Sequence, residues 1–269
     1  MLCMFSKYLQ KLEYVDIGPI IKQLGFEGCD LTVRPGGHVE PDKVQVDMLR
    51  AIESLRGDGV EVGMLTTEIT SHEPFASRAI LAIAGRSGVQ YFKPGSWPYS
   101  ATDSIEQRLG IVRQQMAGVV MLGRAYGIAA GFHNEAGDHV GEATWDTWAI
   151  LNGLEPRWAG YYFDPCYATA EGGVAGWNIA LRLAMPRLKM LAVQDFYWEK
   201  SGGKWQMRMC PLGQGMVDWP KVFSMLAAAK FTGPISLHCE YNPPDVLEAI
   251  ARDFAFLKKQ MGAVYPDRA

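Results

Sequence analysis

Short apolar segments and longer amphipathic segments alternate along the whole of this 269-residue chain. The apolar segments have the length and composition of β-strands, and they cover Leu2–Phe5, Gly28–Val33, Val60–Thr66, Gln90–Lys93, Ile128–His133, Gly160–Asp164, Met190–Gln194 and Ile235–Glu240. The amphipathic segments predict helices at Val15–Leu24, Val44–Arg56, Phe75–Arg86, Ile105–Tyr126, Thr144–Leu154, Asn178–Leu183, Pro220–Ala229 and Asp245–Gln260. Eight strand–helix units in about 250 residues are typical of a (β/α)8 TIM barrel.

An open, doubly wound sheet is the main alternative α/β fold. Such a sheet has fewer units and usually a glycine-rich phosphate loop after its first strand, whereas here the first strand runs into Ser6-Lys7-Tyr8. No Pro/Ser-rich linker or block of charge divides the chain. We therefore predict one domain, a TIM barrel over residues 1–269.

Composition restricts the partners of this protein. The net charge of −3 disfavours binding to nucleic acid, which requires a basic surface. No apolar run reaches the roughly 18–20 residues of a membrane span, and the N-terminus lacks the pattern of a signal peptide. The five cysteines form no CxxC pair, which indicates a reducing compartment. We expect a cytoplasmic protein with a small-molecule partner, no nucleic acid and no membrane.

Polar and apolar residues alternate in the last predicted strand. Ser236, His238 and Glu240 share one parity, and the residues between them are apolar. Since side chains of one parity point to one face of a strand, these three are predicted to point into the barrel, where polar groups are costly unless they are paired or functional.

Two more strands present polar residues at their carboxyl ends, where barrel enzymes place their active sites. His133 ends the fifth predicted strand, Glu135 follows it, and Asp164 ends the sixth. Histidine and carboxylates on three strands at matching heights predict an active site.

Other polar residues at the predicted mouth are candidates for substrate binding. Arg34 and His38 follow the second strand and either contact an anion or hydroxyl or form a surface loop with an Arg–carboxylate pair. Lys93 ends the fourth strand. The long polar segment Asp195–Met216 is predicted to be a loop, either a lid that touches substrate or a solvated excursion.

Several segments together resemble the bacterial sugar phosphate isomerase/epimerase proteins of the xylose isomerase-like TIM-barrel superfamily. They are Phe5–Gln10, Gly28–Val39, Gly131–Gly137, Phe163–Pro165, Val193–Phe196, Cys210–Gly215 and Pro234–Tyr241. The superfamily includes ketose 3-epimerases, hydroxypyruvate isomerase and inosose dehydratase. The resemblance implies a carbohydrate substrate and, because relatives often dimerise, a homodimer.

The resemblance also implies a divalent metal, Mg²⁺, Mn²⁺ or Zn²⁺, held by Glu, Asp, His and Glu on strands five to eight. Asp164 and Glu240 match this set, His133 stands where the first Glu is usual, and Ala192 stands where the His is usual. A site of His133, Asp164 and Glu240 could still bind an ion with water completing its shell.

The implied reaction is isomerisation or epimerisation through an enediolate, which needs a base and positive charge beside the carbonyl. Glu240 is expected to be a metal ligand and base, with Glu135 as the opposite acid/base. The expected substrate contacts are Arg34, His38, Lys93, Asp195 and His238.

Three alternatives share parts of this pattern. A dehydratase or lyase acting on a keto-sugar would use the same enolate chemistry, and a metal-free sugar-binding relative is favoured by Ala192. An endonuclease of the related apurinic-site repair fold is disfavoured because only five histidines are present.

A zinc deaminase is excluded. His133-x-Glu135 and Pro165-Cys166 match part of its signature, but Thr169 stands where the second cysteine is required.

Overall fold

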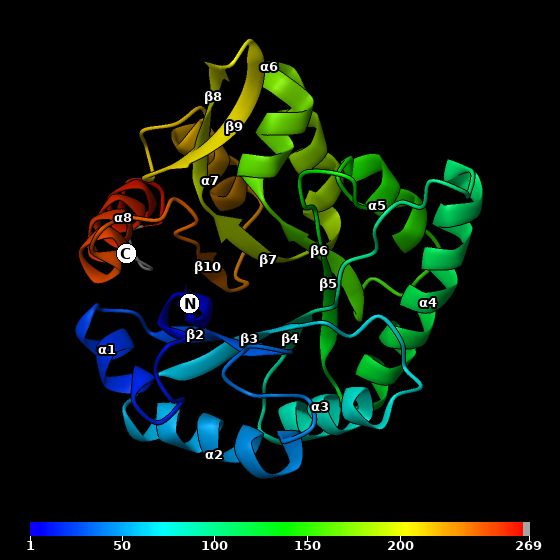
Figure 1. Ribbon diagram of the computed structural model, residues 1–269, viewed down its shortest axis with the longest axis vertical. Helices are drawn as coiled ribbons and strands as arrows, with labels where there is room; N and C mark the ends of the chain where they lie inside the picture. Colours follow the sequence, from blue (N-terminus) through cyan, green and yellow to red (C-terminus); the bar gives the residue numbers. More distant parts are fainter. Residues whose placement is uncertain (266–269) are drawn as a thin grey trace.

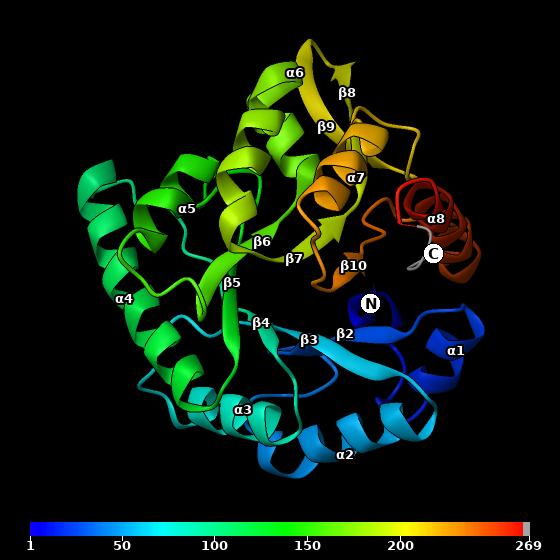
Figure 2. The same cartoon turned by 180° about the vertical axis from the view of Figure 1, so that it is seen from behind.

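A computed structural model describes residues 1–265 of the chain. Within these residues eight parallel strands close a barrel in the order β1-β10-β7-β6-β5-β4-β3-β2, and helices surround it in both views (Figures 1 and 2). The barrel strands are β1 (Leu2–Phe5), β2 (Gly28–Val33), β3 (Glu61–Thr67), β4 (Tyr91–Lys93), β5 (Ala129–His133), β6 (Ala159–Phe163), β7 (Leu188–Val193) and β10 (Ile235–Leu237). The predicted α/β fold, a (β/α)8 TIM barrel, is confirmed.

The helices lie in the order that the sequence predicts, one after each barrel strand. They are α1 (Ile17–Gln23), α2 (Val44–Gly57), α3 (Phe75–Arg86), α4 (Ile105–Ala125), α5 (Thr144–Leu151), α6 (Pro165–Ala184), α7 (Trp219–Ala228) and α8 (Val246–Gly262). Two short 3-10 helices, η1 (Ser6–Leu9) and η2 (Met185–Arg187), follow β1 and α6. Over residues 1–265, no helix is both long enough and apolar enough to cross a membrane.

The helix α6 is much longer than the predicted segment Asn178–Leu183. Asp164 caps its N-terminus by accepting from the backbone N–H groups of Cys166 and Tyr167, and Pro165 occupies its first turn, as a helix start favours. Gly173 has non-helical dihedrals (φ 61°, ψ −161°) inside the helix. The kink at Gly173 interrupts the helical spacing of apolar residues along α6. The sequence therefore predicted a helix only in the part of α6 that follows Gly173.

The segment predicted as the loop Asp195–Met216 is mostly a β-hairpin, so that prediction was wrong. The strands β8 (Asp195–Ser201) and β9 (Lys204–Cys210) pair antiparallel beside α6 (Figure 1). Gly202 and Gly203 join them with φ of 58° and 79°, and two successive positive φ values are what a two-residue hairpin turn requires.

The barrel interior beneath the mouth contains an apolar layer and a polar layer. Met64, Tyr162, Met190 and Ala192 form the apolar layer, separate from the large core between strands and helices. The polar layer is centred on Asp30, which is fully buried and accepts hydrogen bonds from Thr66 Oγ1 and Ser236 Oγ, both at 2.8 Å. The inward position predicted for Ser236 is confirmed.

Candidate active site

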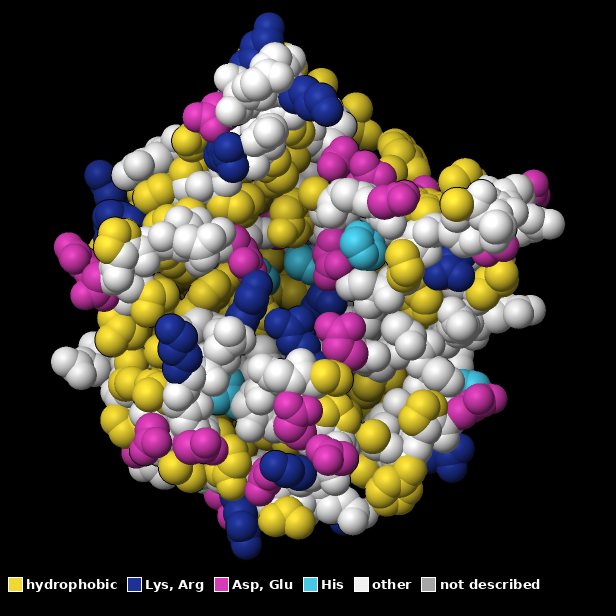
Figure 3. All heavy atoms as spheres, viewed as in Figure 1, with side chains coloured by type: hydrophobic (Ala, Val, Ile, Leu, Met, Phe, Trp, Pro, Cys, Tyr) yellow, Lys and Arg dark blue, Asp and Glu magenta, His cyan; other side chains and the backbone are white. Residues whose placement is uncertain are grey.

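A polar cavity of about 270 Å³ lies at the carboxyl end of the barrel strands. In Figure 3 this face is hollowed at its centre, where basic, acidic and histidine side chains gather. The cavity is lined by residues from the ends of seven barrel strands and the segments after them: Phe5, Lys7, Arg34, Thr66, Glu68, Lys93, Ser96, His133, Glu135, Ala136, His139, Tyr167, His238 and Glu240.

Glu135 and Lys93 form an ion pair on one side of the cavity. Lys93 Nζ lies 2.9 Å from Glu135 Oε1, and Ser96 Oγ donates to Glu135 Oε2 at 2.6 Å. Burial raises the pKa of Glu135, but the charges of Lys93 and His133 more than offset burial and hold the pKa well below its usual range. Glu135 is therefore a carboxylate at neutral pH.

Glu240 and Lys7 form a second ion pair. Lys7 Nζ donates to both carboxylate oxygens of Glu240, at 2.7 and 2.9 Å. Lys7 lies in η1, directly after β1, and Glu240 follows β10. Since β1 and β10 are neighbours in the barrel, strand pairing brings together two residues from opposite ends of the chain.

Two of the histidines that line the cavity, His133 and His238, have pKa values shifted in opposite directions. His133 packs on Tyr162 and lies between Glu135 and Asp164, with Nδ1 3.3 Å from Glu135 Oε1 and Nε2 3.6 Å from Asp164 Oδ2. Burial alone lowers the pKa of His133, but these two carboxylates raise it overall. Burial, together with the charges of His133 and Lys7, holds the pKa of His238 well below its usual range.

His238 is fixed by its neighbours. It stacks on Phe5 with ring centroids 4.5 Å apart, and its Nε2 lies 3.0 Å from the hydroxyl of Tyr162. His238 is therefore a neutral, positioned side chain on the floor of the cavity.

Asp164 is fully buried and does not line the cavity. Its Oδ1 accepts from Cys166 N (2.8 Å) and Tyr167 N (3.2 Å), and its Oδ2 accepts from Gln194 Nε2 (2.5 Å). Both oxygens are therefore engaged in holding α6 and the end of β7.

The residues present do not fit the divalent metal that the resemblance implies. Among the predicted ligands, both oxygens of Glu240 accept from Lys7, and both oxygens of Asp164 accept from N–H donors. At the position where an imidazole is usual, Ala192 has only a buried methyl group. No three His, Cys, Asp or Glu side chains within residues 1–265 form a group that could hold a metal ion.

Arg34, Lys93 and His238 line the cavity, whereas two other predicted substrate contacts, His38 and Asp195, do not. Arg34 lies at the rim, 3.3 Å from Glu68. His38 is tied to the Thr32 hydroxyl and the Leu9 carbonyl, each at 3.1 Å.

Asp195 is likewise directed away from the cavity. It is fully buried, and its carboxylate accepts hydrogen bonds from the backbone of Phe196, Gly213 and Val217 and from the indole of Trp219. These bonds explain why the structure does not bring Asp195 to the mouth.

Residues 20–260 match the family described as xylose isomerase-like TIM barrel. The chain belongs to this family. A search of curated proteins found no match.

Several solved structures share the fold at low sequence identity. The 3-keto-D-glucoside 4-epimerase of E. coli is 13% identical, with 96% of this chain and 98% of that chain covered and a TM-score of 0.75. A xylose isomerase-like TIM barrel protein from Mycobacterium smegmatis, solved in complex with magnesium, is 11% identical, with 98% and 97% covered and a TM-score of 0.75. The probable 3-DHS dehydratase AsbF of Bacillus anthracis is 12% identical, with 96% and 98% covered and a TM-score of 0.73.

Sequence reasoning missed Lys7, Glu68 and Ser96 as residues of the cavity. Lys7 could have been found from the sequence, because it follows the first predicted strand just as Arg34, which was predicted, follows the second. The search for inward polar residues considered strand parity, and Lys7 lies in η1, where parity does not apply.

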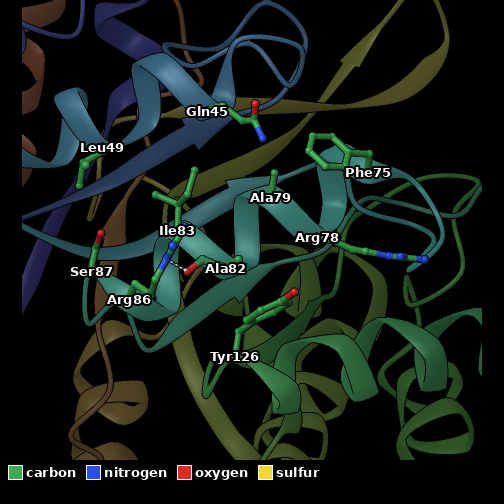
Figure 4. Close-up of a pocket in the computed structure, with 10 residues that line it drawn as sticks. All are labelled: Gln45, Leu49, Phe75, Arg78, Ala79, Ala82, Ile83, Arg86, Ser87 and Tyr126. Carbon is green, nitrogen blue, oxygen red and sulfur yellow. Dashed lines mark hydrogen bonds between the residues drawn. The ribbon is translucent and has the colours of Figure 1, made fainter.

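A larger hollow of about 850 Å³ lies on the outside of the barrel, between α2 and α3 (Figure 4). Its walls are largely apolar, with Leu49, Phe75, Ile83 and Tyr126, and neither a carboxylate nor a histidine lines it. It lacks an acid/base group, so the mouth of the barrel remains the candidate active site.

Proposed function

We propose that this chain is an enzyme that isomerises or epimerises a small carbohydrate, or its phosphate, by moving a proton on the carbon next to a carbonyl. One observation carries the proposal: the cavity contains two lysine-paired glutamates on opposite sides of the barrel. Membership of the xylose isomerase-like family and relatives named as sugar epimerases support the choice of substrate class.

The strand order shows how the two pairs are placed. The pair Lys93–Glu135 joins the neighbouring strands β4 and β5, and the pair Lys7–Glu240 joins β1 and β10. Two strands separate the pairs in either direction around the barrel, β2 and β3 on one side and β6 and β7 on the other. A planar intermediate between the pairs would therefore have one carboxylate near each face.

This arrangement suits proton transfer on both faces of an enediolate. One glutamate removes the carbon-bound proton, and the electron pair moves onto the carbonyl oxygen. The other glutamate, after taking up a proton from water, supplies it to the opposite face. Ammonium groups beside the developing negative charge stabilise the intermediate. The volume of about 270 Å³ is just below the range of about 300–1,000 Å³ for drug-sized ligands, which suits one small metabolite.

Deuterium exchange tests the proposal. The chain is incubated in D₂O with a panel of ketoses, keto-sugars and sugar phosphates, and NMR follows deuterium at the carbon next to the carbonyl. We expect exchange with at least one sugar, and a loss of about 10²–10⁴-fold in Glu135→Gln and in Glu240→Gln. Wild-type exchange rates in both variants would refute the assignment.

Product analysis in the same samples separates the alternatives. Elimination of water from the enediolate would give an unsaturated or deoxy product and identify a dehydratase or lyase. Binding of a sugar without exchange would identify a non-catalytic binding protein.

We also propose that the protein resides in the cytoplasm. All five cysteines lie within the described residues, and each is free and buried. Free cysteines are typical of a reducing compartment.

A further inference from the structure

Two carboxylates of the cavity are held by ammonium groups: Glu240, a metal ligand in the set that the resemblance implies, and Glu135, the expected acid/base. Lys7 contacts both oxygens of Glu240, at 2.7 and 2.9 Å, so an ammonium group already neutralises this carboxylate. Lys93 Nζ lies 2.9 Å from Glu135 on the opposite side of the cavity. The cavity therefore contains two ammonium groups, one beside each glutamate, in place of the single divalent ion that the resemblance implies.

The remaining positions of the expected ligand set are closed as well. Three N–H donors occupy the two oxygens of Asp164, and Ala192 is fully buried in the apolar layer. His133 Nε2 is left over, a buried atom with no hydrogen-bond partner among residues 1–265. A single imidazole does not make a divalent metal site, which needs at least three protein ligands or several oxygens.

Lys7 has a free donor for an oxyanion, whereas the three donors of Lys93 are directed to Glu135, Pro94 and Ser96. An ammonium group has three N–H donors, and the hydrogen bonds of Lys7 to Glu240 use two of them. The side chain of Lys7 is one-third exposed toward the open mouth (34%), so a ligand can reach it.

Lys93 is held more rigidly. Its side chain is only 8% exposed, and its Nζ donates to the carbonyl of Pro94 at 3.2 Å. A buried ammonium group needs a fixed partner, and Glu135 provides it. A charge fixed in this way stabilises a developing oxyanion without reorganising during the reaction.

We infer that this site works without a bound divalent metal and that Lys7 and Lys93 supply the positive charge that stabilises the enediolate. The inference rests on the proposed function for its chemical step. Lys7 donates a hydrogen bond to the substrate oxygen, Lys93 acts through its fixed charge, and both keep their own protons. The carbon-bound proton passes to one glutamate, which returns it to the neighbouring carbon in an isomerisation. In an epimerisation the other glutamate first takes a proton from water and delivers it to the opposite face, and the first glutamate releases its proton to water. The step therefore needs no oxidant and no reactant other than water.

Manganese binding tests the first half of the inference without any substrate. Mn²⁺ is titrated into the metal-stripped chain while electron paramagnetic resonance follows the free ion. We expect no stoichiometric binding in the cavity and no change in Tm with Mn²⁺ or EDTA. One Mn²⁺ per chain that Glu240→Gln removes would overturn the inference, whereas an ion unaffected by Glu240→Gln lies elsewhere and leaves it standing.

Lysine substitution tests the second half. Lys7→Met and Lys93→Met remove the charge and keep a chain of similar length, and the exposed Lys11, which does not line the cavity, gives the control Lys11→Met. We expect kcat for deuterium exchange to fall about 10²-fold or more in either cavity variant, with a smaller change in KM and none in Lys11→Met. Lys93→Met leaves the buried Glu135 without its partner and can therefore prevent folding. In that case the result for Lys7→Met alone decides the test.

The outcomes separate the inference from the proposed function. If no sugar undergoes exchange, the proposed function fails, and the Mn²⁺ titration alone decides whether the lysines exclude the ion. If EDTA abolishes wild-type exchange and Mn²⁺ restores it, or if Lys7→Met retains wild-type kcat, the proposed function stands and the inference is overturned.

Discussion

Asp30 shows at the level of one residue how the barrel interior supports a polar site. Its carboxylate is fully buried and held by the hydroxyls of Thr66 and Ser236. Burial raises its pKa from 3.8 to about 6, although the two hydroxyls act in the opposite direction. The sequence predicted that Ser236 points inward, but its partner could not be predicted, because Asp30 is 206 residues away.

The raised pKa of Asp30 predicts a pH dependence of stability. A carboxyl whose pKa is higher in the folded state binds more protons when folded, so its contribution to the free energy of unfolding falls as pH rises from about 4 to about 6. The full change corresponds to about 3 kcal/mol, and Asp30→Asn removes it. Between pH 5 and pH 8, we expect urea unfolding to show the wild type losing about 1–2 kcal/mol relative to Asp30→Asn. A difference that does not vary with pH would show that Asp30 does not titrate in this range.

At the scale of elements, Asp195 fastens the hairpin to the barrel. Its carboxylate joins β8, the segment after β9 and the first residue of α7 through Phe196, Gly213, Val217 and Trp219. A Cβ at Gly215 would collide with this carboxylate, so glycine is needed there for the close approach. Gly202 and Gly203 form the turn of the hairpin, but both strands are largely exposed. Without a buried face they lack the apolar alternation of a strand, and the hairpin was interpreted as a loop.

Removal of the Asp195 carboxylate should loosen this unit. Asp195→Ala leaves buried N–H groups without an acceptor, and each unsatisfied group costs about 1–3 kcal/mol. We expect the free energy of unfolding to fall by about 3 kcal/mol or more, with a smaller loss in Asp195→Asn, which retains one acceptor oxygen.

Urea unfolding followed by tryptophan fluorescence measures the effect, because the indole of Trp219 donates to Asp195. Asp42→Ala, at an exposed position, is the matched control and should change stability by less than about 0.5 kcal/mol. Equal stability of Asp195→Ala and the control would show that the carboxylate does not hold the hairpin.

At the scale of the whole molecule, closure of the barrel creates the site. Eightfold alternation along the chain predicted the fold, and the position of each strand end predicted the face on which His133, Glu135 and Glu240 lie. The pairing of Lys7 with Glu240 could not be predicted in this way, since 233 residues separate them and they meet only because β1 pairs with β10. The sequence therefore predicted which acidic groups reach the mouth but not which cations hold them.

Exchanging the charges of Lys7 and Glu240 separates the contribution of this ion pair to stability from its contribution to catalysis. Lys7→Glu places two carboxylates together, and because both side chains are partly exposed (34% and 27%), we expect a loss of only about 1 kcal/mol. Combining Lys7→Glu with Glu240→Lys restores opposite charges, so the double variant should recover most of that stability in a double-mutant cycle. Its deuterium exchange should remain about 10²-fold or more below wild type, because base and oxyanion donor have changed places. If the double variant recovered both deuterium exchange and stability, the Lys7–Glu240 pair would have only a structural role in joining β1 to β10.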